Sequence, residues 1–182
     1  MNNDSTFTEL LIEDYKEPLL LETINNPDIE WFSEYNFLIK EISPEILSKD
    51  RFFKWLMSHY EFRAGICRVP EFTCYDWHKD IHRGVSINML INESSDHHSH
   101  CFFSLNRDYA KKRILSKRIT NNFMELCYKP YRRYVVNNQH DHIIFNFDET
   151  RYLFTINFEL TKDKLNYNDF ISFLIKHQRE WM

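Results

Sequence analysis

The chain has 182 residues and a formal net charge of −4, which suits one domain and gives no overall attraction to nucleic acid or to an anionic membrane. It contains only two glycines, Gly65 and Gly84, where average usage of about 7% would give roughly 13. Because phosphate-binding loops need several closely spaced glycines, the sequence excludes P-loop enzymes and dinucleotide-fold enzymes.

The cysteines and the absence of long apolar runs indicate the compartment. The four cysteines are widely spaced and form no C-x-x-C pair, which is typical of reduced thiols in an intracellular protein. No stretch approaches 18 consecutive apolar residues, and no basic segment precedes an apolar run at the N-terminus. We therefore expect a cytoplasmic protein without a membrane partner.

The first half of the chain changes from helical to extended patterns. Ser43-Pro44 is typical of a helix start, and the apolar residues that follow recur at helical spacing up to Tyr60. From residue 62 to residue 75 the pattern turns to short β-type runs. Alternating residues over 85–91 predict a strand.

The second half is mainly extended. We predict a helix over 107–127 and an amphipathic C-terminal helix over 168–181. The predicted strands here are residues 100–105, 134–136, 142–147 and 152–160. This order predicts an α+β protein with a β core over about 62–160, flanked by helical segments over 1–61 and 161–182.

The sharpest local motif is His78-Lys79-Asp80. On an extended segment, residues two apart point the same way, so the imidazole of His78 and the carboxylate of Asp80 converge. They supply two of the three ligands of a 2-His-1-carboxylate metal site. The alternative is a polar pair on a surface turn.

A third ligand and a fixed cation follow downstream. His142 lies 64 residues after His78, and Arg151 lies nine residues after His142. We predict that the two strands around them form a hairpin across 147–150, with both side chains inside a β barrel. The alternative for Arg151 is a surface ion pair with one of the acidic residues of that turn. His140 shares a strand face with His142, so geometry alone does not choose between them.

The sequence contains, in this order, a His-x-Asp motif, a distant His-x-x-x-Asn motif and an arginine before an apolar strand. With these motifs it resembles the Fe(II)/2-oxoglutarate-dependent dioxygenases. The similarity is closest to small prolyl-hydroxylase-like and aspartyl/asparaginyl-hydroxylase-like members from bacteria and phages, and it covers about residues 62–160. The resemblance favours His142, which has Asn146 four residues on, over His140 as the third ligand. It also implies a double-stranded β-helix, the jelly-roll or cupin-like fold, within a single domain over 1–182.

The resemblance implies a complete site. Iron would be held by His78, Asp80 and His142, and the far carboxylate of 2-oxoglutarate by Arg151, with further cosubstrate contacts from two residues, Thr155 and Asn88. With O2, such an enzyme hydroxylates an unactivated C–H bond of a small molecule, amino acid or peptide side chain and releases succinate and CO2. The alternative function is a cupin-like barrel that binds a metal or small ligand without turnover, which would need no arginine behind the third ligand.

Two further clusters have ordinary interpretations. We expect His97, His98 and His100 to lie in a solvated loop rather than in a second metal site. Six Lys and Arg residues over 107–118 suit the polar face of a helix, or else a docking face for an acidic or phosphorylated substrate. Substrate contacts in such barrels come from variable rim loops rather than from motifs.

Overall fold

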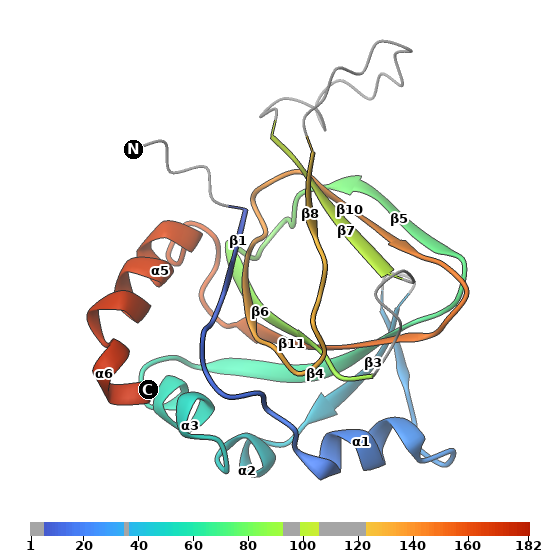
Figure 1. Ribbon diagram of the computed structural model, residues 1–182, viewed down its shortest axis with the longest axis horizontal. Coiled ribbons are helices and arrows are strands. Elements are labelled where there is room, and N and C mark those ends of the chain that lie inside the picture. The colour runs from blue at the N-terminus through green and yellow to red at the C-terminus, as the bar shows by residue number, and fades with distance from the viewer. Residues whose placement is uncertain (1–5, 35–36, 93–98, 106–122) are drawn as a thin grey trace.

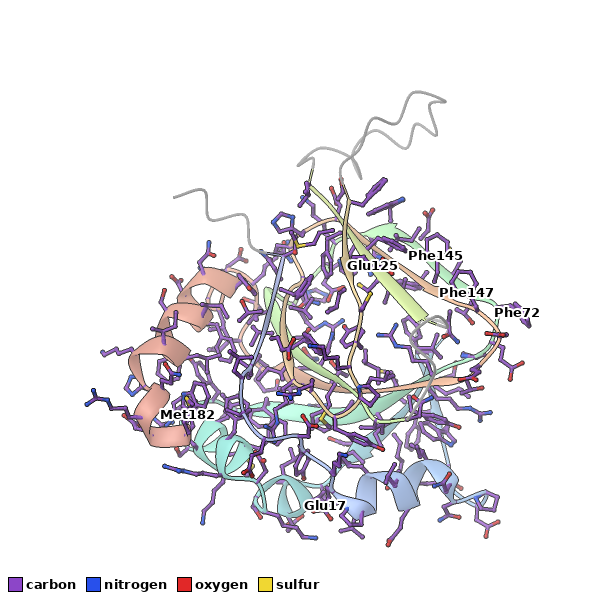
Figure 2. All side chains as sticks on the ribbon, viewed as in Figure 1. Glu17, Phe72, Glu125, Phe145, Phe147 and Met182 are labelled. Carbon is purple, nitrogen blue, oxygen red and sulfur yellow. The ribbon has the colours of Figure 1, made fainter. Side chains whose placement is uncertain are left out.

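The computed structural model describes residues 6–34, 37–92, 99–105 and 123–182, and its core is a pair of facing antiparallel sheets (Figure 1). The larger sheet has the order β1-β9-β6-β11-β4-β3-β2 and the smaller sheet has the order β5-β10-β7-β8. Side chains fill the space between the sheets (Figure 2). This is the predicted α+β jelly-roll arrangement.

Every strand pair in both sheets is antiparallel. The larger sheet consists of β1 (Phe7–Glu9), β9 (Tyr134–Asn137), β6 (Val85–Leu90), β11 (Arg151–Phe158), β4 (Phe62–Val69), β3 (Phe37–Ile42) and β2 (Phe32–Glu34). The smaller sheet consists of β5 (Thr73–His78), β10 (His142–Asn146), β7 (Ser99–Ser104) and β8 (Phe123–Leu126).

Helices cover the outer face of the larger sheet (Figure 1). Three of them begin at side-chain caps, where Glu17, Asp50 and Asn166 accept hydrogen bonds from the backbone N–H groups of Leu19, Phe53 and Asp169. The described helices are α1 (Pro18–Asn25), α2 (Pro44–Leu47), α3 (Arg51–Met57), α5 (Tyr167–Lys176) and α6 (Gln178–Trp181). None of them has the length and apolar character needed to cross a membrane.

Strand β11 separates two apolar cores. Phe154 and Ile156 pack on the helix side with the buried residues of α3 and α5. Leu153 packs on the opposite side, in the core between the two sheets. Since side chains alternate along a strand, Arg151 and Thr155 share the inner face with Leu153. This alternation directs Arg151 into the barrel.

The predicted hairpin between β10 and β11 is wrong. Strand β10 pairs with β5 and β7 in the smaller sheet, whereas β11 pairs with β4 and β6 in the larger one. The face of β11 that carries Phe154, Ile156 and Phe158 is apolar, so β11 is best buried as a central strand with helices behind it. Nδ2 of Asn146 donates hydrogen bonds to the carbonyl oxygens of Val69, Pro70 and Glu149, all within 3.1 Å. These hydrogen bonds hold the connection from β10 in the smaller sheet to β11 in the larger one.

Two other expectations differ from the structure, and a third falls outside the described residues. Residues 123–126 form strand β8 and not the end of a helix, because they pair with β7; the rest of that predicted helix lies outside the described residues. The segment 1–61 is not only helical, since β1, β2 and β3 extend the larger sheet at its two edges. Of the clusters at 97–100 and 107–118, only the backbone of His100, in β7, is described.

Candidate metal centre

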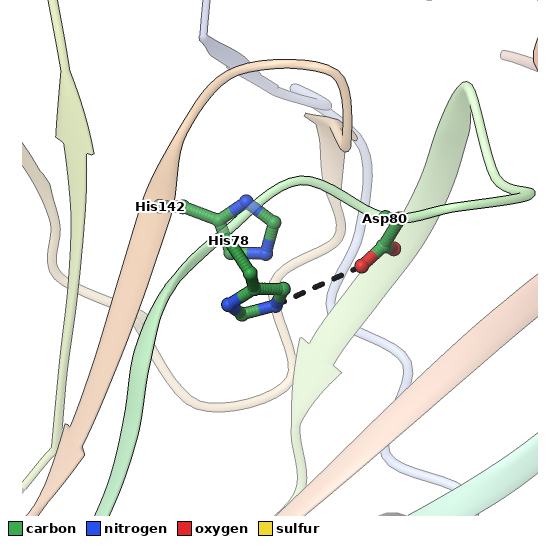
Figure 3. A group of neighbouring side chains, drawn as sticks. All are labelled: His78, Asp80 and His142. Atoms are coloured by element: carbon green, nitrogen blue, oxygen red, sulfur yellow. Dashed lines mark ion pairs between the residues drawn. The ribbon is translucent and has the colours of Figure 1, made fainter. Parts of the chain in front are cut away.

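The smaller sheet brings His78, Asp80 and His142 together (Figure 3). His78 ends β5 and His142 begins β10, and the two residues are cross-strand partners. Asp80 follows in the loop after β5. One ligand atom from each of the three residues lies within 4.8 Å of the other two, and among the described residues no other such group occurs.

Both imidazoles are oriented in the same way. Nδ1 of His78 lies 2.7 Å from the carbonyl oxygen of Asp76, and Nδ1 of His142 lies 2.9 Å from that of His140. Because a carbonyl oxygen only accepts hydrogen bonds, each Nδ1 carries the proton and each Nε2 presents its lone pair. This is the arrangement in which histidine binds a metal.

His142 is held in its neutral form. The side chain is 5% exposed, and burial, reinforced by the neighbouring His78, lowers its pKa to about 4. The ring centroids of His78 and His142 are 4.2 Å apart. Two protonated rings at this distance would repel each other, whereas two neutral rings can share one cation.

The carboxylate of Asp80 is fixed by two donors. Oδ2 accepts hydrogen bonds from Nε of Arg83 at 2.7 Å and from Nδ2 of Asn138 at 2.8 Å. Oδ1 lies 3.7 Å from Nε2 of His78. The three side chains thus offer two imidazole nitrogens and one carboxylate oxygen, a donor set that suits Fe(II) with positions left for other ligands.

His140 does not join this group through its side chain. Its carbonyl oxygen instead orients the ring of His142. Of the two histidines that the strand pattern left open, the structure brings His142 to the cluster.

Arg151 lies on the inner face of β11 and is buried, at 2% exposure. This burial does not fit the alternative prediction, in which Arg151 forms an ion pair on the protein surface. Its Cζ lies 4.7 Å from the ring centroid of Tyr128, in the range of a cation–π contact. Burial raises the pKa of Tyr128 far above its usual range, against the opposing effect of Arg151, so the Tyr128 hydroxyl stays protonated.

The other two predicted cosubstrate contacts are linked to Arg151 through the same tyrosine. Thr155 and Asn88 are cross-strand partners on β11 and β6, and the Thr155 hydroxyl donates to Oδ1 of Asn88 at 2.8 Å. Nδ2 of Asn88 donates to the Tyr128 hydroxyl at 3.3 Å. The predicted residues therefore belong to one connected polar group inside the barrel.

Sequence reasoning missed two kinds of residue here. Tyr128 lies between β8 and β9 in a segment without a motif, so no local signal could have found it. Arg83 follows the His-x-Asp motif by three residues and Asn138 is one of two adjacent asparagines, but neither position carries a motif of its own. Their role depends on a contact between loops 55 residues apart.

Comparison with known proteins supports the fold. No protein-family profile and no curated sequence matches the chain. Among solved structures, a prolyl-4-hydroxylase from Pseudomonas putida is 15% identical, with a TM-score of 0.59, over 85% of this chain and 92% of that one. HygX from Streptomyces hygroscopicus, with nickel and 2-oxoglutarate bound, is 9% identical, with a TM-score of 0.58, over 84% and 82%.

A third similar structure is a prolyl hydroxylase from Trichoplax adhaerens, in complex with a hypoxia-inducible-factor peptide fragment. It is 14% identical, with a TM-score of 0.54, over 86% of this chain and 84% of that one. At these identities the likeness concerns the fold. The chain has the fold of the 2-oxoglutarate- and Fe(II)-dependent oxygenases.

Proposed function

We propose that this protein is an Fe(II)- and 2-oxoglutarate-dependent dioxygenase that hydroxylates an unactivated C–H bond. The observation that carries the proposal is the cluster of His78, Asp80 and His142, in which one ligand atom of each residue lies within 4.8 Å of the other two and both Nδ1 atoms face backbone carbonyl oxygens. When bound, iron and 2-oxoglutarate supply the oxidation by O2, with release of succinate and CO2.

The metal would be held by His78, Asp80 and His142. Their hydrogen bonds to backbone carbonyls and to Arg83 and Asn138 fix the rings and the carboxylate before any metal binds. Such outer contacts hold ligands in the required geometry and typically change metal affinity by about 10–100-fold when removed.

Arg151 would bind the far carboxylate of 2-oxoglutarate. A buried guanidinium is costly unless an anion and hydrogen bonds compensate it, and its planar fork matches a carboxylate. Tyr128 places an aromatic ring beside the guanidinium, and the hydroxyl groups of Tyr128 and Thr155 add polar atoms to the same region. This cation is what favours the dioxygenase over a cupin-like barrel that binds a metal without turnover.

Three substrate classes fit the proposed chemistry. A small molecule, an amino acid and a peptide side chain all suit a barrel of this kind. Two of the three structures described above are prolyl hydroxylases, one of them in complex with a peptide, so a peptidyl proline is the first substrate to test.

The proposal is tested by anaerobic reconstitution with Fe(II), followed by titration with 2-oxoglutarate. We expect one Fe(II) per chain and a visible charge-transfer band that saturates with 2-oxoglutarate. Air should then give succinate, and a substrate in a panel of proline peptides and free amino acids should accelerate its release. Iron binding without the band would favour the cupin-like alternative, and the His78→Ala variant is the control for adventitious iron.

A further inference from the structure

The two oxygens of the Asp80 carboxylate have different surroundings. Oδ2 accepts two hydrogen bonds, from Arg83 at 2.7 Å and from Asn138 at 2.8 Å. Oδ1 faces Nε2 of His78 at 3.7 Å. Hydrogen bonds to a carboxylate are among the stronger ones in proteins, so Oδ2 is held while Oδ1 is available.

The backbone of Asp80 is fastened to the same turn as its side chain. Its N–H donates to the carbonyl oxygen of Asn138 at 3.0 Å, and its own carbonyl accepts from Nε2 of Gln139 at 2.9 Å. Gln139 also donates to the carbonyl of Arg83 at 2.7 Å. Four contacts thus tie residues 80–83 to the turn that precedes β10.

The opposite side of this loop is held by the turn before α5. The N–H of Lys162 donates to the carbonyl oxygen of His82 at 2.8 Å. At Gly84, a Cβ atom would lie 2.2 Å from the carbonyl oxygen of Leu165, so the two segments touch along their backbones. The loop that carries Asp80 is therefore enclosed on two sides, and Arg83 and Asn138 act on a carboxylate that cannot easily shift.

We propose that Arg83 and Asn138 are positioning residues that restrict Asp80 to ligation through Oδ1 alone. The inference rests on the proposed function and adds a requirement to it. A carboxylate that bound through both oxygens would occupy four positions of an octahedral metal together with His78 and His142. Only two would then remain, whereas a cosubstrate that chelates through two atoms, together with O2, needs three.

The two positioning residues differ in charge, which matters for the test. Loss of Arg83 removes a hydrogen bond to Asp80 and also a positive charge that repels the metal, so its effect on metal affinity is mixed. Asn138 is neutral and 3% exposed, and its loss removes the hydrogen bond alone. The number of open coordination positions reports the ligation mode without this ambiguity.

The experiment uses Mn(II) as the probe and counts the exchangeable waters on the bound ion from EPR line broadening in 17O-enriched water. We expect three waters in the wild type and two in Arg83→Met/Asn138→Leu. Leucine replaces Asn138 with an apolar group of similar shape, and Oδ1 of Asn138 has no hydrogen-bond partner to lose. The double variant, reconstituted with Fe(II), should also need about tenfold more 2-oxoglutarate to reach half of its charge-transfer band.

The matched control is Arg63→Gln. It removes the exposed ion pair in which Nε of Arg63 lies 3.0 Å from Oε1 of Glu159. It should keep three waters and the wild-type titration. Arg83→Met alone, at a partly exposed site that tolerates replacement, should shift both measurements in the same direction as the double variant.

Three waters and an unchanged 2-oxoglutarate titration in both Arg83→Met and the double variant would overturn the inference. The same loss of a water and the same shift of the titration in Arg63→Gln would also overturn it. These results leave the proposed function intact, because the wild type would still bind Mn(II) and form the 2-oxoglutarate band. A wild type that binds no metal and forms no band refutes the proposed function and the inference with it.

Discussion

His78 and His142 lie directly opposite each other on β5 and β10, and each is bound through Nδ1 to the carbonyl oxygen two residues before it. Their rings are 4.2 Å apart although 63 residues separate them in the chain. The same local contact, repeated on two strands, gives both rings one tautomer and one orientation. A metal would meet a site that needs little rearrangement.

This relationship predicts different results for the two neighbouring histidines. His142→Ala should abolish Fe(II) binding, because it removes a ligand nitrogen. His140→Ala should leave binding near the wild-type level, because the backbone carbonyl that orients His142 remains. Anaerobic titration with Fe(II), followed by iron analysis after desalting, measures both. Intact binding in His142→Ala together with loss in His140→Ala would reverse the assignment.

Replacing Arg151 should affect the cosubstrate and not the metal. Charge-assisted hydrogen bonds are worth about 1.5–3 kcal/mol each, so Arg151→Ala should weaken 2-oxoglutarate binding by roughly ten- to a hundredfold or more. Arg151→Lys should fall between, because lysine keeps the charge and loses the fork. The charge-transfer titration gives the midpoint, and Mn(II) binding should be unchanged in both variants. An unaltered midpoint in Arg151→Ala would favour the cupin-like alternative.

Tyr128 offers a finer test of the same region. Tyr128→Phe keeps the ring that lies 4.7 Å from Arg151 and removes only the hydroxyl that accepts from Asn88. One neutral hydrogen bond contributes about 0.5–1.5 kcal/mol, so the 2-oxoglutarate midpoint should rise about two- to tenfold. Tyr128→Leu, which also removes the aromatic face, should raise it further. Equal midpoints in the wild type and both variants would place Tyr128 outside the cosubstrate site.

The two glycines should respond differently to alanine. At Gly84 the new Cβ would lie 2.2 Å from the carbonyl oxygen of Leu165, which no backbone can accept without moving, so Gly84→Ala should lower the free energy of unfolding by about 1–3 kcal/mol. At Gly65, in β4, the nearest atom is the carbonyl oxygen of Lys40 at 3.2 Å, and the cost should be below about 1 kcal/mol. Urea unfolding of the metal-free protein measures both. A larger loss at Gly65 would contradict this packing.

A buried ion pair near the helices should contribute to folding alone. Arg133 is 2% exposed and pairs with Asp50, which also caps α3, and its guanidinium lies within 5.7 Å of the ring centroids of Tyr15, Phe52 and Phe53. Breaking such a pair on one side leaves a charge without compensation, so Arg133→Met should cost about 3 kcal/mol in urea unfolding.

The exposed pair of Arg63 and Glu159 is the control for that measurement. Surface pairs contribute about 0–1 kcal/mol, so Arg63→Gln should be nearly neutral. Similar values for Arg133→Met and Arg63→Gln would show that burial of Arg133 adds nothing to stability.

The sequence by itself determined the local features of the site. The two-residue spacing of His78 and Asp80 and the inward register of Arg151 both follow from the period of two in an extended chain. This period is a property of each segment alone, so it can be recognised without knowledge of the neighbouring strands. The α+β jelly-roll fold was predicted from the strand-rich middle of the chain together with the family resemblance.

Only the tertiary structure decided which strands pair and what surrounds the site. It assigned β10 and β11 to different sheets, because each strand is buried by elements from distant parts of the chain. It also brought Tyr128 to Arg151 and Asn138 to Asp80, across loops whose sequences carry no periodic signal. Such contacts depend on the packing of the whole barrel, whereas a local sequence pattern specifies only the direction of each side chain.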